Sequence, residues 1–295
     1  MAVTIAVVVL VFGAYWWMRT GDPARDGAPS WAPDGKSLVF SVEVGAGKGD
    51  IYVMRADGSE RRNLTNSPDA NDTSPTMSFD GRTIAFESDR GGNVDIYVMD
   101  LGGMNVRRLT NDPADDRSPA WSPDGSHLAF TSTRGRHDGA DLYVMNADGS
   151  DAHRLTSDGS VWAPQYSRDG HSIAFQMNRD VYVIDAVTRA IRPITSDPDN
   201  GMNPTWSPDG QQLAFVTTRN RQAELFTANS NGTDPKAVVS LPSGAAIDPR
   251  WSPDGSKIAF VLVPQGPESE KDSRRDVQAI YTVDLASGTL TRLSR

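Results

Sequence analysis

Residues 119–130, with the sequence PAWSPDGSHLAF, contain the pattern that decides the fold. A proline is followed by any one residue and then by a large side chain, as Pro119 is by Ala120 and Trp121. Asp-Gly comes three positions after the large side chain, and a short apolar run that ends in phenylalanine follows. In Ser-Pro-Asp-Gly the proline favours a type I turn, the aspartate can accept a backbone N–H, and the glycine takes the left-handed conformation. The stretch therefore predicts two strands joined by a tight turn.

The same pattern occurs six times along the chain. From proline to glycine, the copies span 29–35, 75–81, 119–125, 164–170, 204–210 and 249–255. Their glycines, at positions 35, 81, 125, 170, 210 and 255, are separated by 46, 44, 45, 40 and 45 residues. A period near 45 residues is typical of propeller blades.

Each repeat continues with two more strand-like runs. Asp-Ile-Tyr-Val-Met at 95–99 is one example of the third run, and Arg-Arg-Leu-Thr at 107–110 is one of the fourth. Four strands in each of six repeats predict an all-β fold, a six-bladed β-propeller of four-stranded antiparallel blades over residues 28–295. The chain begins with the first strand of blade one and ends with the fourth strand of blade six, so no blade needs strands from both termini. The ring should therefore close by packing blade six directly against blade one.

Most repeated residues are explained by structure. The recurring Asp-Gly pairs fit turns better than a metal or phosphate site. One large aromatic residue per blade could form a carbohydrate-stacking surface, but its constant offset favours packing between neighbouring blades. The residues concerned are Trp31, Trp121, Trp206 and Trp251. The aspartate before each third run is expected to pair with an arginine of the preceding loop, as Asp95 with Arg90.

Composition excludes several functions. The chain has 295 residues and a formal net charge of -9, which argues against a nucleic-acid partner. It has no cysteine, so disulfides, thiolate metal sites, a cysteine nucleophile and a lipidated cysteine are excluded. There is no Gly-x-Ser-x-Gly motif, and the four histidines have no partners at metal-ligand spacing. We therefore expect no catalytic residues and no enzyme activity.

The N-terminal segment is expected to contact a membrane. Residues 2–18 contain no charge and are followed by Arg19, so residues 1–18 predict one N-terminal transmembrane helix, with 19–27 as a linker. A cleaved signal peptide and a buried strand are the alternatives. Arg19 and Arg25, read literally, would place the propeller in the cytoplasm.

Binding residues are expected on one face of the ring. In each blade, the loop between the second and third strands and the connection to the next blade lie on one side, here called the crossover face; the two hairpins lie on the opposite side, the hairpin face. The crossover face carries many acidic residues, which predict either a partner-binding surface or a solvated rim. These are Asp69, Asp72, Asp112, Asp115, Asp116, Asp158, Asp197, Asp199 and Asp248.

Oxygen-bearing residues near the repeated prolines are expected at the mouth of the central channel. Oxygen ligands that converge there could hold Ca²⁺, which takes six to eight of them. The residues are Asp72, Ser74, Asp116, Ser118, Asn203 and Asp248. No other cofactor is expected.

The repeat Pro-x-Trp-Ser-Pro-Asp-Gly, with Asp-Ile-Tyr-Val-Met and Arg-Arg-Leu-Thr, resembles the TolB-type propeller repeat. The resemblance covers residues 28–295 and implies a bacterial cell-envelope protein. The expected function is thus a non-catalytic, monomeric scaffold that binds a protein or peptide through its acidic crossover face, with the propeller outside the cytoplasm. The alternative is a carbohydrate-binding module, hydrolase or lyase that uses the central channel. Similar repeats form the propellers of prolyl oligopeptidase-type peptidases, whose hydrolase domain has no counterpart in these residues.

Overall fold

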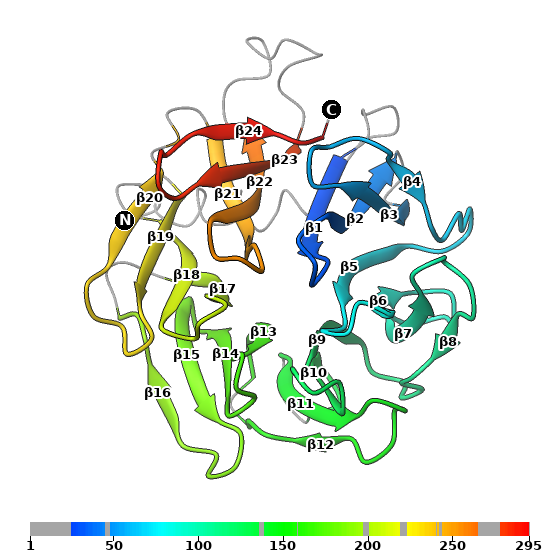
Figure 1. The fold of residues 1–295 in the computed structure, drawn as a ribbon. Helices are drawn as coiled ribbons and strands as arrows, with labels where there is room; N and C mark the ends of the chain where they lie inside the picture. The colour runs from blue at the N-terminus through cyan, green and yellow to red at the C-terminus, as the bar shows by residue number, and fades with distance from the viewer. Residues whose placement is uncertain are drawn as a thin grey trace, which may run out of the picture.

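The computed structural model consists of six four-stranded sheets. Figure 1 shows them arranged as a ring about a common axis. The structure describes residues 25–44, 48–135, 139–157, 159–196, 201–218, 223–239, 241, 244–264 and 278–294. All its regular elements are β-strands, and each sheet is antiparallel. The prediction of a six-bladed all-β propeller is confirmed.

The strands follow the repeats in chain order. Blades 1 to 3 comprise β1 (Arg25–Trp31), β2 (Ser37–Val44), β3 (Lys48–Arg55), β4 (Arg62–Asn63), β5 (Asp72–Met77), β6 (Thr83–Ser88), β7 (Asp95–Asp100), β8 (Arg107–Arg108), β9 (Asp116–Trp121), β10 (His127–Ser132), β11 (Asp141–Asn146) and β12 (His153–Arg154). Blades 4 to 6 comprise β13 (Val161–Tyr166), β14 (Ser172–Met177), β15 (Asp180–Asp185), β16 (Ile191–Pro193), β17 (Met202–Trp206), β18 (Gln212–Thr217), β19 (Glu224–Asn229), β20 (Lys236–Val239), β21 (Gly244–Trp251), β22 (Lys257–Pro264), β23 (Ala279–Asp284) and β24 (Leu290–Arg292).

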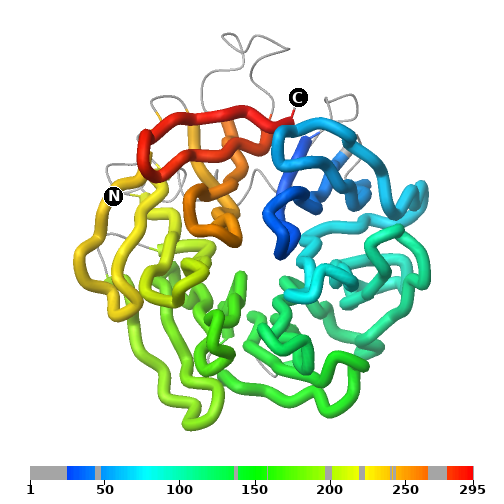
Figure 2. Tube along the Cα trace, in the orientation of Figure 1, coloured from blue at the N-terminus to red at the C-terminus, as the bar shows by residue number. Residues whose placement is uncertain are grey.

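The first strand of every blade lies innermost, beside the channel, and the fourth lies at the outer edge (Figure 2). No blade described combines strands from both ends of the chain. The ring closes where β1 meets β21. There the indole Nε1 of Trp31 donates to the carbonyl of Arg250 at 3.2 Å, and Gln278 Nε2 donates to the carbonyl of Asp26 at 3.1 Å. The predicted packing of blade six against blade one is confirmed.

The Ser-Pro-Asp-Gly turns have the predicted chemistry. In blade 3 the hydroxyl of Ser122 donates to Asp124 Oδ1 at 2.6 Å, and the Ser126 backbone N–H donates to the same oxygen at 3.0 Å. Gly125 has φ of +71°, a conformation that costs glycine little. The repeated aspartates and glycines are therefore accounted for by turn formation.

The hydrophobic core lies between neighbouring blades. Trp121 of blade 3, only 6% exposed, packs in one cluster with Phe130 of its own blade and with Ile96 and Val98 of blade 2. Trp31, Trp206 and Trp251 lie at the equivalent blade interfaces. The prediction that these tryptophans are core residues is confirmed.

A β-bulge interrupts the innermost strand of every blade. At each bulge the residue before the repeated proline has a positive φ, which is uncommon for a non-glycine residue and contrary to the usual pre-proline preference. The six residues, with φ between 45° and 53°, are Ala28, Ser74, Ser118, Ala163, Asn203 and Asp248. The repeat thus places one strained backbone position per blade along the channel, a feature that the sequence pattern did not predict.

The predicted transmembrane helix over residues 1–18 lies outside the described residues. Within the described ranges, no helix has the length and apolar character needed to cross a membrane. The first strand, β1, begins at Arg25, inside the predicted linker of residues 19–27. The helix therefore stays a prediction.

Candidate functional site

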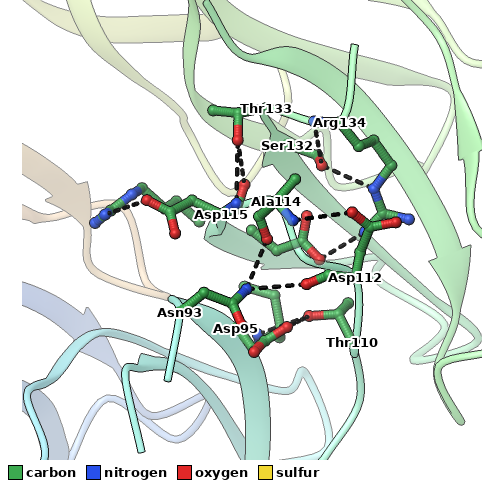
Figure 3. Close-up of polar contacts among 12 residues, drawn as sticks. Asn93, Asp95, Thr110, Asp112, Ala114, Asp115, Ser132, Thr133 and Arg134 are labelled. Atoms are coloured by element: carbon green, nitrogen blue, oxygen red, sulfur yellow. Dashed lines mark hydrogen bonds and ion pairs between the residues drawn. The ribbon is translucent and has the colours of Figure 1, made fainter. Parts of the chain in front are cut away.

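The loops of the crossover face are held by side chains that bridge one loop to the next. Figure 3 shows the connection from blade 2 to blade 3. Asn93 Nδ2 donates to the carbonyls of Asp112 at 3.0 Å and Ala114 at 2.8 Å. The backbone N–H of Val94 donates to Asp115 Oδ1 at 3.2 Å. These bonds fix the connection against the loop between β6 and β7.

A second kind of contact ties four of the connections to the start of the third strand. The Thr110 hydroxyl donates to Asp95 Oδ1 at 3.1 Å, and the Thr110 hydroxyl oxygen accepts the backbone N–H of Ile96 at 3.0 Å. The same aspartate-threonine pair recurs as Asp50 with Thr65, Asp141 with Thr156 and Asp180 with Thr195. The crossover face is therefore preorganised in at least these four blades.

The expected ion pair between Asp95 and Arg90 is wrong. Asp95 pairs instead with Arg108 of β8, which comes after it in the chain. Arg90 pairs with Asp72, which opens the innermost strand β5, at 2.7 Å. Because β5 and β6 are antiparallel, the loop after β6 returns to the start of β5, and this brings Arg90 over Asp72. Burial still raises the pKa of Asp95, against the opposing effects of Thr110 and Arg108.

Three such aspartate-arginine pairs stand at the starts of the innermost strands of blades 1 to 3. The ion pairs are Asp26–Arg61 at 2.6 Å, Asp72–Arg90 at 2.7 Å and Asp116–Arg134 at 2.6 Å. The three carboxylates are at most 1% exposed, whereas the arginines are 20–29% exposed. We call these contacts the arginine struts.

Each strut arginine also lies over a pair of aromatic rings. The guanidinium carbon of Arg134 is 5.5 Å from the ring centre of Phe130 and 5.1 Å from that of Tyr143. Equivalent contacts join Arg61 and Arg90 to the rings of their own blades. The struts thus combine a buried ion pair with cation–π contacts, which hold the arginine in one place.

The strut formed by Asp26 and Arg61 also links the two ends of the ring. Burial raises the pKa of Asp26, while the Ser294 hydroxyl and the charge of Arg61 act in the opposite direction. Ser294 follows β24, the last strand. One carboxylate therefore contacts residues from both blade 1 and blade 6.

Several aspartates of the predicted acidic face are buried or paired with arginines. Asp72 and Asp116 are fully buried beneath arginines, so they present no free negative charge to a partner. Asp115 is paired with Arg117 at 2.9 Å. Asp112 is half-buried and caps a turn at Ala114 N, whereas Asp69 is exposed. Asp158, Asp197 and Asp199 lie outside the described residues. Around blades 2 and 3 the face therefore carries paired charges of both signs.

The predicted channel-mouth residues lie on successive innermost strands. Asn203 Nδ2 donates to Asp248 Oδ1 at 2.9 Å, which joins the bulges of blades 5 and 6. The Ser118 N–H donates to Glu87 Oε1 at 2.8 Å, and Arg117 lies 3.6 Å from the same carboxylate. Ser74 occupies the equivalent bulge of blade 2, with φ of 50°. These residues form a hydrogen-bonded mouth of mixed charge.

The predicted Ca²⁺ ligands are the oxygen-bearing residues at the channel mouth. Among the described residues there is no group of three or more acidic or histidine side chains that could hold a metal ion. Of the predicted ligands, Asp72 and Asp116 are occupied by Arg90 and Arg134. Burial also lowers the pKa of Arg250, an effect that the charge of Asp248 opposes. Calcium binding at the mouth stays a prediction.

Comparison with known proteins agrees with this architecture. A family model described as the TolB beta propeller domain matches residues 20–97, 90–180 and 157–266. A TolB homolog from Chlorobium chlorochromatii is 34% identical over 140 residues, which are 47% of this chain and 32% of that protein. The chain covers only about a third of the length of the first such relatives, 32% and 34%.

Solved structures extend the comparison to the fold. TolB from Acinetobacter baumannii has a TM-score of 0.66 and 27% identity, covering 78% of this chain and 57% of its own. An oligogalacturonate lyase in complex with manganese has a TM-score of 0.63 at 15% identity, covering 92% of this chain and 78% of its own, which is a likeness of fold alone. Because the family model matches most of the sequence, this chain belongs to the TolB β-propeller family.

Proposed function

We propose that this protein is a non-catalytic scaffold of the bacterial cell envelope that binds a protein or peptide partner through its crossover face. The observation that carries the proposal is the set of contacts that fixes the loops of this face. Asn93 holds the connection between blades 2 and 3, and the aspartate-threonine pairs hold four connections. A preordered surface loses little conformational entropy on binding.

The chemistry of the face fits a polypeptide partner. The strut arginines are partly exposed and offer N–H groups, while exposed carboxylates such as Asp69 offer acceptors. Backbone amides and carbonyls of a partner need both kinds of group. The net charge of -9 disfavours polyanionic partners at long range.

The proposed location follows from the TolB-family resemblance and from the uncharged residues 2–18. We place the propeller outside the cytoplasm and assign residues 1–18 as its membrane anchor. An enzyme that uses a metal ion in the central channel has less support, because among the described residues no group of three or more acidic or histidine side chains could hold one.

The proposal is tested by capture from native membranes after chemical cross-linking, with the full-length protein as bait. One variant, Asp69→Lys with Asp112→Lys, reverses two charges on the crossover face. The matched control, Glu60→Lys with Asp151→Lys, makes the same charge change in exposed hairpins of the opposite face. We expect the first variant to recover at least fivefold less of a specific partner. Equal recovery from both variants would exclude binding through this part of the crossover face.

A further inference from the structure

Two of the six turns between first and second strands, on the hairpin face, depart from the repeat. Blade 2 carries Phe79 directly before Asp-Gly, and blade 4 carries Arg168 there. The other four blades have proline at this position: Pro33, Pro123, Pro208 and Pro253. Blades 2 and 4 lie on either side of blade 3 in the ring (Figure 1), yet the guanidinium carbon of Arg168 is 4.9 Å from the centre of the Phe79 ring. The two departures therefore meet in one cation–π contact.

This contact draws Phe79 away from the turn of blade 3. In the four blades with proline, the proline ring lies against the turn glycine of the following blade, 3.5–3.9 Å from where a Cβ on that glycine would be. The glycines that follow Phe79 and Arg168 around the ring are Gly125 and Gly210. No described atom beyond their own chain neighbours lies within 4 Å of the same point on these two glycines. The surface that a proline would cover on blade 3 is therefore open.

A cavity of about 290 Å³ lies at this place, between blades 2 and 3. Asp80 of blade 2 lines one side, and Asp124 and Gly125 of blade 3 line the other. Val98 and Trp121 add apolar surface. Pockets for drug-sized ligands are about 300–1,000 Å³. The cavity is at the low end of this range, so it has room for one small molecule.

The cavity carries two ionised carboxylates. Hydrogen bonds from the Ser78 hydroxyl and from the Arg82 backbone lower the pKa of Asp80, and hydrogen bonds within its own turn lower the pKa of Asp124 to about 2. Both donors to Asp80 bind Oδ1, at 2.6 and 3.0 Å. Its Oδ2 has no hydrogen-bond or ion-pair partner among the residues that the structure describes. One carboxylate oxygen is thus free to accept from a ligand.

One guanidinium also lines the cavity. Arg107 Nη1 donates to the Asp148 carbonyl of blade 3 at 3.1 Å. Arg62 and Arg192, at the same place in blades 1 and 4, likewise donate to carbonyls of the hairpin in the next blade. Arg107 is therefore part of a repeated contact between blades. With two carboxylates and one guanidinium, the lining has a net negative charge.

We propose that the cavity between blades 2 and 3 binds a small organic cation, whose primary ammonium group contacts Asp80 and Asp124. Its short apolar body lies against Val98 and Trp121. An ammonium group offers three donors and no acceptor, which suits carboxylate oxygens. The net charge of -9 favours the approach of a cation. The site lies on the hairpin face and does not depend on the proposed partner surface of the crossover face.

Two other ligands fit less well. A saccharide is held best on the open face of an aromatic ring, but Trp121 is only 6% exposed and packs with Phe130 in the core. A calcium ion takes six to eight oxygen ligands. Within the described ranges, no group of three or more acidic or histidine side chains could hold a metal ion. An ammonium compound needs only the two carboxylates.

The test is equilibrium dialysis of radiolabelled putrescine, a four-carbon diamine, against the full-length protein in detergent at constant ionic strength. Asp80→Asn removes the charge but keeps the Oδ1 acceptor of the turn. The matched control Asp209→Asn makes the same change in blade 5, where Pro208 covers the next glycine, Gly255. Phe79→Pro restores the proline of the other blades and should fill the cavity, whereas Phe79→Ala leaves it open. Melting temperatures establish that each variant is folded.

We expect saturable binding that Asp80→Asn weakens about tenfold, as the loss of one charge-assisted hydrogen bond implies. Phe79→Pro should abolish binding, and Asp209→Asn and Phe79→Ala should leave it unchanged. If Phe79→Pro does not fold, the two aspartate variants decide. Butane-1,4-diol, the uncharged analogue, should not displace putrescine.

The inference is overturned if putrescine does not bind saturably, or if Asp80→Asn and Asp209→Asn bind it equally. Binding that survives in folded Phe79→Pro would place the ligand elsewhere, and displacement by butane-1,4-diol would show that charge is not recognised. Tighter binding of Nα-acetyl-lysine methylamide than of putrescine would make the occupant a lysine side chain of another protein, which also contradicts a free small cation. None of these outcomes bears on partner capture through the crossover face.

Discussion

The first prediction tests whether the arginine strut formed by Asp116 and Arg134 is a buried ion pair or only a surface contact. Replacing Arg134 by methionine keeps an apolar stem of similar length but removes the guanidinium. Asp116, whose side chain is 0% exposed, then loses the partner at 2.6 Å that compensates its charge. The hydrogen bond from Arg134 Nε to Ser132 Oγ and the contacts with Phe130 and Tyr143 are lost as well.

The expected cost follows from the burial of the carboxylate. Removing one partner of a buried ion pair costs about 3–5 kcal/mol, because the remaining charge is left in a poorly solvated place. We expect about 3 kcal/mol for Arg134→Met, since the crossover face allows some relaxation toward water. That is a large part of the roughly 5–15 kcal/mol by which a folded protein is stable. Asp116→Val should cost less, about 1 kcal/mol, because a 20% exposed arginine can turn toward solvent.

Removing both partners should restore most of the stability. Blade 4 already has the apolar version, with Val161 paired in register with Met177 where blade 3 pairs Asp116 with Ser132. Moreover, Asp116 Oδ1 is buried without a hydrogen-bond partner, so the ion pair is not fully satisfied. The double variant Asp116→Val with Arg134→Met should therefore be only about 1 kcal/mol less stable than wild type.

Urea unfolding of the four proteins, followed by tryptophan fluorescence, measures these differences. Additive effects of the two substitutions would refute the reasoning, because they would mean that Asp116 and Arg134 do not depend on one another. A loss below about 1 kcal/mol for Arg134→Met would do so as well, since it would place the carboxylate in contact with water.

Two further predictions concern the turns. Hydrogen bonds from Ser122 and Ser126 lower the pKa of Asp124 from 3.8 to about 2. The stability that the ionised Asp124 contributes is therefore present above pH 4 and is lost as the pH falls toward 2. In Asp124→Asn the melting temperature should depend less on pH over this range, and an unchanged dependence would contradict the prediction. Gly103→Ala should be more destabilising than Gly92→Ala, by more than about 1 kcal/mol in urea unfolding. Both glycines have positive φ, a conformation that costs a residue with a Cβ about 1–2 kcal/mol. Only at position 103 would the added Cβ also meet the Leu64 carbonyl oxygen of blade 1, at 2.4 Å. Equal losses of stability in the two variants would exclude an inter-blade clash.

The fold was predictable because every repeat carries the same local signals. The Asp-Gly turn, which Ser-Pro precedes in three of the repeats, follows from the backbone preferences of its residues. The six copies of the longer pattern, from its first proline to the Asp-Gly pair, fix the number of blades. The packing of Trp121 between blades followed from its constant offset. The bulges were not predictable in this way, because a positive φ before proline opposes the usual preference of that position.

The candidate site was harder to predict, because its contacts join residues that are far apart in the chain. Arg90 is nearer in sequence to Asp95 than to Asp72, yet antiparallel pairing brings it to Asp72. For the same reason, aspartates that read as an acidic rim are in part buried struts. The position of an aspartate at the start of an innermost strand, with an arginine two residues after the second strand, was the signal that could have identified Asp72 and Asp116.

In a repeat protein, positions that agree in all blades carry the fold, so function should be sought where one blade departs from the others. In blades 1 to 3 a buried carboxylate at the start of the innermost strand is paired with an arginine from a long loop or from next to the outer strand. Blade 4 has none of these there, and Trp162 stands uncovered as a result. Stability alone would favour covering an indole. Among the six residues at this position, each directly before the positive-φ residue of a bulge, Trp162 alone is exposed, so its exposure is a property of blade 4 and not a requirement of the repeat.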